Sequence, residues 1–233
     1  MILLRRISLV AFAILLLYVA ISSNHSYSVP TDAQPLNNNS IKLIIDAGHG
    51  GFDGGASASD GTLEKDINLQ IALELYDFCK LGGHQVILTR NSDAGTEKDE
   101  NDSIANRKKS DMQRRLSIIE ENPDAIFVSI HLNKFTTSTA QGAQVFYSKN
   151  NINSQNLAKS VQSSIILLTQ PNNTRTIKKG DNSIFLLKKA TIPAIIVECG
   201  FLSNPEELAL LKNSEYQSKI AFSIYCGILK YYN

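Results

Sequence analysis

The 233-residue chain contains no tryptophan, and aromatic residues make up only 7% of it. A surface that binds sugars by stacking them on many aromatic rings is therefore not expected. Excess charge is also absent, because 23 Lys and Arg residues against 22 Asp and Glu residues leave a net charge of +1. A nucleic-acid partner would favour a clearly basic surface, so no nucleic acid is expected.

Cysteine is scarce too, and three cysteines exclude two kinds of site. An odd number without motif spacing argues against a disulfide framework, and the spacing matches no cysteine-type zinc site. Cys79 and Cys226 fall in helical patterns. Cys199 follows Glu198 in an apolar run, where strand alternation would point it to the opposite face. We interpret all three as small buried apolar residues, with a Cys79–Cys226 bridge as the less favoured alternative.

The first 22 residues have the pattern of a targeting segment. Arg5 and Arg6 precede an uncharged run, 7–22, rich in Leu, Ile, Val and Ala. Residues 1–22 are therefore predicted to be a signal peptide or an N-terminal membrane anchor, a little short of the roughly 20 apolar residues that span a bilayer. The following domain would then be exported, either secreted or anchored at the outer face of the membrane, in the cell wall or spore envelope. The polar segment 23–40 is predicted to be a flexible linker.

Apolar runs alternate with helical patterns over residues 41–233, which we expect to form one domain. Strands separated by helices imply an α/β fold with a mainly parallel, twisted sheet of about six strands and helices on both faces. The expected strands are 42–47, 84–90, 125–131, 142–148, a short piece near 184–187, and 194–199. The expected helices are 64–80, 107–121, 154–169, 205–212 and 214–231.

The most informative stretch is 44–55, which reads IIDAGHGGFDGG. A short apolar run ends there at His49, which is surrounded by glycines. Buried strands of α/β proteins have such runs, and ligands bind at their carboxyl ends. Glycines let the backbone turn sharply and leave room beside the imidazole. His49 can thus be a metal ligand, a general base or only a turn residue.

Three other residues are placed to act with His49. His131 and Glu198 lie toward the carboxyl ends of further apolar runs, and Glu64 lies where a loop becomes an amphipathic helix. Burying a carboxylate such as Glu198 in an apolar strand is costly without a partner, whereas helix-dipole stabilisation alone would explain Glu64. If the runs share one sheet, two imidazoles and two carboxylates converge. Two His and one carboxylate form a common zinc set, and the second carboxylate can take a proton from water.

Four motifs in this order resemble the zinc-dependent N-acetylmuramoyl-L-alanine amidases, and more narrowly the amidase-3 catalytic domain. They are DAGHGG at 46–51, LEKD at 63–66, SIHLN at 129–133 and VECGFLSN at 197–204. The resemblance covers about residues 41–232. It implies that His49, Glu64 and His131 bind one Zn²⁺ and that Glu198 is the catalytic glutamate. The implied substrate is peptidoglycan, cleaved between the lactyl group of N-acetylmuramic acid and L-Ala of the stem peptide.

The chain is also similar to the CwlD-type amidases of spore-forming bacteria. The stretches 107–122, 173–175, 178–179 and 216–231 carry this likeness. It implies a role in spore cortex maturation and germination, in which stem peptides are removed so that a partner deacetylase can form muramic-δ-lactam. Arg90 and Arg115 match arginines of the family, and either can bind a substrate carboxylate; structural ion pairing is the alternative for Arg115. Asn133 is a further possible substrate contact.

Two other functions remain open at this point. One is a different zinc peptidase of peptidoglycan, and the other is a non-catalytic module that only binds the cell wall. The second should have lost a metal ligand, and none of the four positions is lost. The polar segment 171–182 lacks the apolar stripe of a helix that could dock over the site, so we expect an uncovered cleft. Control would then come from outside, for example from an exported or membrane-anchored partner protein that affects activity or zinc binding.

Overall fold

The structure is a computed structural model that describes residues 40–96 and 102–233. Residues 39–233 form one compact unit around a six-stranded sheet, with the strand order β2-β1-β3-β6-β4-β5. Strands β2, β1, β3 and β6 run parallel to one another, and β4 is antiparallel to β6. The strands are β1 (Lys42–Ala47), β2 (Gln85–Leu88), β3 (Ile126–Asn133), β4 (Gln144–Tyr147), β5 (Lys178–Lys179) and β6 (Ala194–Phe201).

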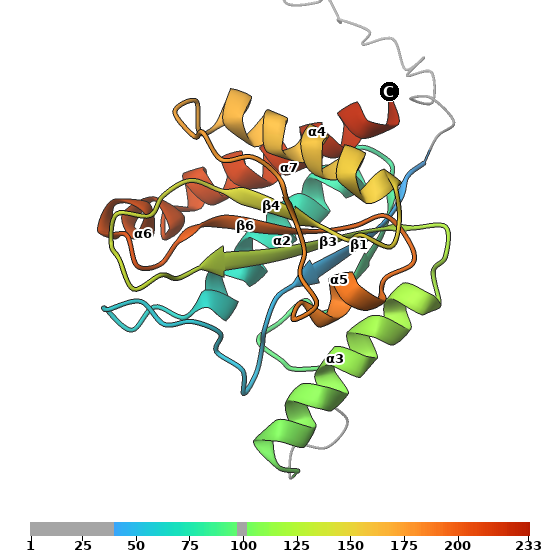
Figure 1. The fold of residues 1–233 in the computed structure, drawn as a ribbon, viewed down its shortest axis with the longest axis horizontal. Helices are drawn as coiled ribbons and strands as arrows, with labels where there is room; N and C mark the ends of the chain where they lie inside the picture. Colours follow the sequence, from blue (N-terminus) through green and yellow to red (C-terminus); the bar gives the residue numbers. More distant parts are fainter. Residues whose placement is uncertain (1–39, 97–101) are drawn as a thin grey trace, which may run out of the picture. The chain divides into compact units, whose positions relative to one another are not determined.

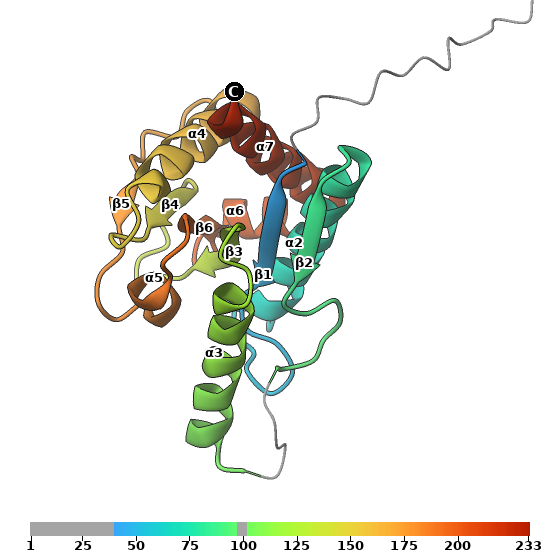
Figure 2. The ribbon, with the colours of Figure 1, turned by 90° about the vertical axis from the view of Figure 1, so that its right-hand side faces the viewer.

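Helices cover both faces of the sheet (Figures 1 and 2). The helices α2 (Glu64–Leu81), α4 (Asn153–Leu168) and α7 (Ser214–Tyr232) lie on one face, and α7 packs against the other two. The helices α3 (Ile104–Glu120) and α5 (Phe185–Lys189) lie on the other face, and the short α6 (Pro205–Leu211) follows β6. Burial of apolar side chains between these layers supplies the main favourable term in folding.

Strand alternation divides the apolar residues into two cores, one on each face. In β1, for example, Leu43 and Ile45 belong to the core under α2, α4 and α7, whereas Ile44 belongs to the core under α3 and α5. The first core also contains Cys199, which therefore points away from the face of its neighbour Glu198, as the alternation predicts. All three cysteines are free thiols.

The predicted fold class is confirmed, and one predicted strand is wrong. The run 184–187 was expected to be a strand, but Phe185–Lys189 is the helix α5, and the fifth strand is instead Lys178–Lys179. A short apolar run does not distinguish a strand from a buried helical turn. Here Leu186 and Leu187 are buried against the sheet as one side of a turn, 5% and 1% exposed.

The predicted targeting segment 1–22 and nearly all of the predicted linker 23–40 lie outside the described residues, and both stay predictions. Across the part of the chain that the structure describes, no helix has the length and apolar character needed to cross a membrane.

Candidate active site at the carboxyl edge of the sheet

The glycine-rich turn after β1 places His49 beside His131. His49 has a φ of 61°, the left-handed conformation that residues other than glycine rarely adopt. Such backbone conformations cost energy and cluster at functional sites. The neighbouring Gly48 lies so close to His131 that a Cβ atom there would be 2.3 Å from the His131 Nε2 atom. The turn therefore requires glycine at position 48 in order to bring the two imidazoles together.

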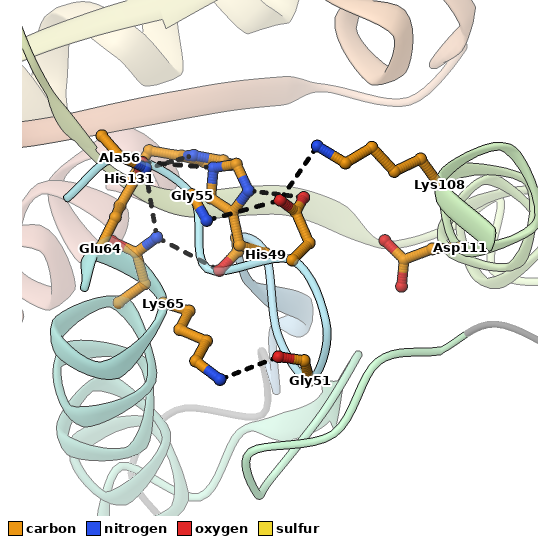
Figure 3. A network of polar contacts seen from close by, with 12 residues as sticks. His49, Gly51, Gly55, Ala56, Glu64, Lys65, Lys108, Asp111 and His131 are labelled. Atoms are coloured by element: carbon orange, nitrogen blue, oxygen red, sulfur yellow. Dashed lines mark hydrogen bonds and ion pairs between the residues drawn. The ribbon is translucent and has the colours of Figure 1, made fainter. Parts of the chain in front are cut away.

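His49, Glu64 and His131 form one cluster (Figure 3). One ligand atom from each lies within 4.8 Å of the other two. Glu64 Oε2 is 3.3 Å from His49 Nε2, and Glu64 Oε1 is 3.0 Å from His131 Nδ1. The rings meet edge to face, with their centroids 5.0 Å apart. Two imidazoles and one carboxylate at this spacing can hold a metal ion.

The Glu64 carboxylate is fixed from several sides. The backbone N–H groups of Ala56 and Leu132 donate to its two oxygens, at 2.9 and 3.1 Å, and the Asn68 amide donates at 3.4 Å. Burial alone would raise the pKa of Glu64, but hydrogen bonds and charges of the two histidines outweigh it and hold the pKa well below its usual range. Glu64 is therefore an anion, which suits a metal ligand.

Asp53, four residues after His49, holds the outer side of its ring. Asp53 Oδ2 lies 2.8 Å from His49 Nδ1, and Lys108 Nζ of α3 lies 3.2 Å from Asp53 Oδ1. Burial alone would lower the pKa of His49, but the hydrogen bonds to Asp53 and Glu64 outweigh it and raise that pKa to about 9. The contact at Nδ1 turns Nε2 toward Glu64 and His131. A carboxylate in this position commonly orients a metal-binding histidine.

Glu198 completes the group from the adjacent strand. It is the register partner of His131 in the parallel pair β3–β6, so both side chains lie on the same face. Its Oε2 atom has almost no exposed surface and no hydrogen-bond partner among the described residues. Burial is the main cause that raises the pKa of Glu198 above its ordinary value. A buried, unpartnered carboxyl oxygen beside a cluster that could hold a metal ion is suited to carrying a proton.

A cleft of about 260 Å³ opens on the face between α3 and α5. His49 and His131 line it, and their side chains are 25% and 22% exposed. Met112 of α3 and the segment 184–186 form an apolar wall. The segment 184–186 belongs to the span 134–197 between the second histidine and Glu198. It forms a side wall of the cleft and leaves both imidazoles accessible. That arrangement agrees with the expectation of an uncovered cleft.

The two arginines predicted as possible substrate contacts are buried. Arg90, 6% exposed, donates to the backbone oxygens of Ala47, Gly48, Lys65 and Ser92. Because all of its guanidinium nitrogens already have backbone acceptors, Arg90 holds the turn after β1 in place, and the structure does not bring it to a substrate.

Arg115 has no exposed surface. It forms ion pairs with Asp46 and, at 2.9 Å, with Asp111, and it donates to the backbone oxygens of Ala47 and His49. Arg115 therefore has the structural ion-pairing role that was the alternative to substrate binding. Asn133 ends β3 two residues after His131, is partly buried, and remains a proposed substrate contact.

Sequence reasoning missed Asp53 as a functional residue. The available signal was an acidic side chain inside a glycine turn, four residues after a candidate histidine. It was not decisive, because acidic residues are common in turns for local reasons.

A family model described as N-acetylmuramoyl-L-alanine amidase matches residues 43–230. The chain belongs to the N-acetylmuramoyl-L-alanine amidase family. One relative is the germination-specific N-acetylmuramoyl-L-alanine amidase of Bacillus subtilis, 37% identical over 190 residues, which cover 82% of this chain and 79% of the relative.

Solved structures of other amidases share the fold. The CwlD amidase of Clostridioides difficile, solved in complex with the GerS lipoprotein, has a TM-score of 0.80 and 43% identity, with 82% of this chain and 98% of that chain covered. The amidase AmiC2 of Nostoc punctiforme has a TM-score of 0.71 and 31% identity, with coverages of 84% and 99%. This amidase is therefore an enzyme of peptidoglycan hydrolysis, and the readings as another peptidase or a non-catalytic module are set aside.

Proposed function

We propose that this amidase uses one Zn²⁺, held by His49, Glu64 and His131, to cleave the amide between the lactyl group of N-acetylmuramic acid and L-Ala of the stem peptide. The observation that carries the proposal is the cluster of two imidazoles and one carboxylate beside the unpartnered oxygen of Glu198. Nitrogen and carboxylate donors in a set of three, with room for a further ligand, are typical of catalytic zinc.

The chain's own residues divide the work of hydrolysis. When bound, the ion would act as a Lewis acid that acidifies water and polarises the carbonyl group of the scissile amide. Glu198 takes a proton from the attacking water on a carboxylate oxygen and delivers it to the departing nitrogen of L-Ala. Its raised pKa makes it a better proton acceptor than an exposed glutamate. Asp53 holds His49 by its Nδ1 atom, so that Nε2 stays available to the ion.

We further propose a role in spore cortex maturation, outside the cytoplasm. It is supported by the likeness to a germination-specific amidase and to an amidase solved with a lipoprotein. Because the latter forms a complex with another protein, we propose that an exported or membrane-anchored partner protein binds here too and that it controls activity or zinc binding. Removal of stem peptides in this setting would precede formation of muramic-δ-lactam.

The two glutamates give a test that separates chemistry from metal binding. Glu198→Gln cannot take up the proton, so we expect it to keep zinc and lose about 10²–10⁴-fold in turnover. Glu64→Gln removes the negatively charged ligand, so we expect this variant to bind less zinc and to lose activity for that reason. Zinc content is measured by elemental analysis, and products by mass spectrometry of digested peptidoglycan, where an amidase frees the amino group of L-Ala. Near wild-type turnover of Glu198→Gln would move the proton-transfer role to another residue.

A further inference from the structure

One arginine near Glu198 forms no ion pair with a described residue, although its charge interacts at longer range with Glu207. Arg175 lies in the segment between α4 and β5 and is partly exposed. Its Nε donates to the Gln141 carbonyl oxygen at 2.8 Å, and one terminal nitrogen donates to Gln144 Oε1 at 2.9 Å. The guanidinium carbon lies 4.6 Å from the centre of the Phe201 ring. Within residues 40–96 and 102–233, no carboxylate lies within ion-pair distance of it.

Arg175 differs in this respect from the other arginines around the site. Arg90 and Arg115 are buried, and protein acceptors take up their donors. Arg175 is oriented by two neutral acceptors and an aromatic ring, and its second terminal nitrogen has no acceptor among the described residues. A guanidinium held in this way presents a fork that matches a carboxylate.

Sheet register places this cation on the catalytic face. Gln144 opposes Glu198 in the antiparallel pair β4–β6, and Glu198 pairs with His131 in β3–β6. Directly opposed residues share a face, so the Gln144 side chain that contacts Arg175 is on the same side as the two catalytic candidates. Neighbouring strands are about 4.8 Å apart, which puts Gln144 roughly 10 Å from His131.

That separation matches the length of a short peptide. An extended chain advances about 3.3–3.6 Å per residue, so a carboxylate on the second residue after a scissile amide lies up to roughly 7 Å from it, and a hydrogen bond of about 3 Å to a guanidinium accounts for the rest. The lactyl carboxyl of the uncleaved substrate is tied up in the amide and carries no charge. An anionic group at this distance must therefore belong to the peptide side of the substrate.

Beyond Arg175 there is room for the rest of that peptide. Arg175 borders a second cleft of about 600 Å³, which runs between the segment 139–142, the segment 169–175 and α6. This volume lies in the range of ligand-binding sites. Glu207, a half-buried acid that lines this cleft, accepts hydrogen bonds from the backbone N–H groups of Gly142 and Phe201, at 2.7 and 2.8 Å. The charge of Arg175 opposes the rise that burial causes in the Glu207 pKa, so the two groups interact across the cleft, but they form no ion pair.

We propose that Arg175 determines substrate specificity by binding the carboxylate of the second residue of the stem peptide, which then extends from Glu198 toward the second cleft. This inference rests on the proposed function and deepens it by giving the direction of the peptide. Both terminal nitrogens of the guanidinium turn toward the ligand, while Nε keeps its contact with the Gln141 carbonyl oxygen.

The test uses two peptidoglycan fragments that differ only at the second residue of the peptide, with its carboxylate either free or amidated. Wild-type protein is compared with Arg175→Gln, Arg175→Lys and the control Lys179→Gln, which removes an exposed charge four residues away. A hydrogen bond to a charged group corresponds to about tenfold to a hundredfold in affinity. We expect wild type and the control to prefer the free carboxylate by that factor in kcat/KM.

Arg175→Gln should lose this preference through a higher KM with little change in kcat, because binding that is equal in ground and transition states affects KM alone. Arg175→Lys should keep part of it. Equal cleavage of both fragments by wild type would overturn the inference, and so would an equal loss on both fragments in Arg175→Gln, which is the mark of a structural role.

A binding measurement separates this inference from the proposed function. Calorimetry measures the affinity of the same two fragments for two zinc-loaded proteins, Glu198→Gln and the double variant Glu198→Gln with Arg175→Gln. Both should bind the fragments without turning them over. Tighter binding of the free carboxylate that depends on Arg175 supports the inference, whether or not the wild type cleaves the fragments. Failure of the wild type to cleave either fragment would count against the proposed function alone. Absence of that preference in the binding measurement would refute the role of Arg175. Thermal melting of each variant confirms that it is folded.

Discussion

Replacing Arg115 by methionine tests whether this buried guanidinium supports the fold or the substrate. In the structure it neutralises Asp46 and Asp111 and holds the carbonyl oxygens of Ala47 and His49. Methionine fills much of the same space without charge or donors. The Asp46 carboxylate, 1% exposed, would be left with only the Thr89 and Ser129 hydroxyls as hydrogen-bond donors.

The expected cost follows from that burial. Removing one partner of a buried ion pair leaves an uncompensated charge and destabilises proteins by about 3–5 kcal/mol. Domains have a free energy of unfolding of about 5–15 kcal/mol, so Arg115→Met should remain folded with a much smaller margin. The double variant Arg115→Met with Asp46→Asn should regain part of the loss, because Asp111, which still accepts a hydrogen bond from Thr96, is then the one carboxylate that has lost this ion-pair partner.

The assay is urea unfolding of metal-free protein, followed by circular dichroism, with Arg114→Met as the matched control. Arg114 is the preceding residue of α3, its side chain is 49% exposed, and its nearest carboxylate, Glu121, lies 3.8 Å away. An exposed pair of this kind contributes about 0–1 kcal/mol. The midpoint should shift strongly for Arg115→Met and hardly for the control, at an unchanged slope. A stable Arg115→Met protein with a raised KM would refute this reasoning and return Arg115 to the substrate.

Three further outcomes are expected. Asp53→Asn should keep the fold and weaken zinc binding by about 10–100-fold, because it loosens the histidine that it orients; competition with a coloured chelator measures this, and an unchanged affinity would remove Asp53 from the site. Burial alone would raise the pKa of Asp46 in the folded protein, but Arg115 and the hydroxyl donors outweigh it and lower that pKa. The ionised Asp46 therefore stabilises the fold above its unfolded pKa of about 3.9, and this stabilisation is lost as the pH falls from there toward the folded-state pKa. The free energy of unfolding should therefore decline below about pH 4, and a profile that stays flat down to pH 2 would contradict this. Burial raises the pKa of the Cys79 thiol to about 12, so a thiol reagent should label the partly exposed Cys226 before Cys79 in native protein, and the reverse order would contradict the described packing.

The elements that sequence could locate are those with a strong period. The run 42–47 and the stripe of α2 were predicted within a residue of their observed bounds, because each has one periodic pattern and a clear boundary. The run 184–187 has no period of its own. Only its packing against the sheet decides that it is helical, and packing cannot be read from four residues.

The candidate metal cluster could be proposed from sequence because each member lies near the end of a strand or starts a helix at one edge of a parallel sheet. The roles of Arg90 and Arg115 could not be settled in the same way. An arginine after a strand looks the same whether it points to solvent or to backbone carbonyls. Only the structure shows that Arg90 donates hydrogen bonds to the backbone oxygens of Ala47 and Gly48 in the turn after β1. The placement of Arg175 depends on contacts that are more distant in the sequence, with Gln141 before β4 and Gln144 at its start.

The place of β6 in the sheet has a consequence for the way the protein is made. Although β6 is the last strand in the chain, it fills the position between β3 and β4. A growing chain therefore carries the three proposed metal ligands, the last of them His131, well before it carries Glu198, and the central gap closes only when β6 enters. Such long-range pairing comes late in folding. A half-synthesised or truncated chain is thus expected to be inert toward the wall of the cell that produces it, since hydrolytic competence arrives together with the finished fold.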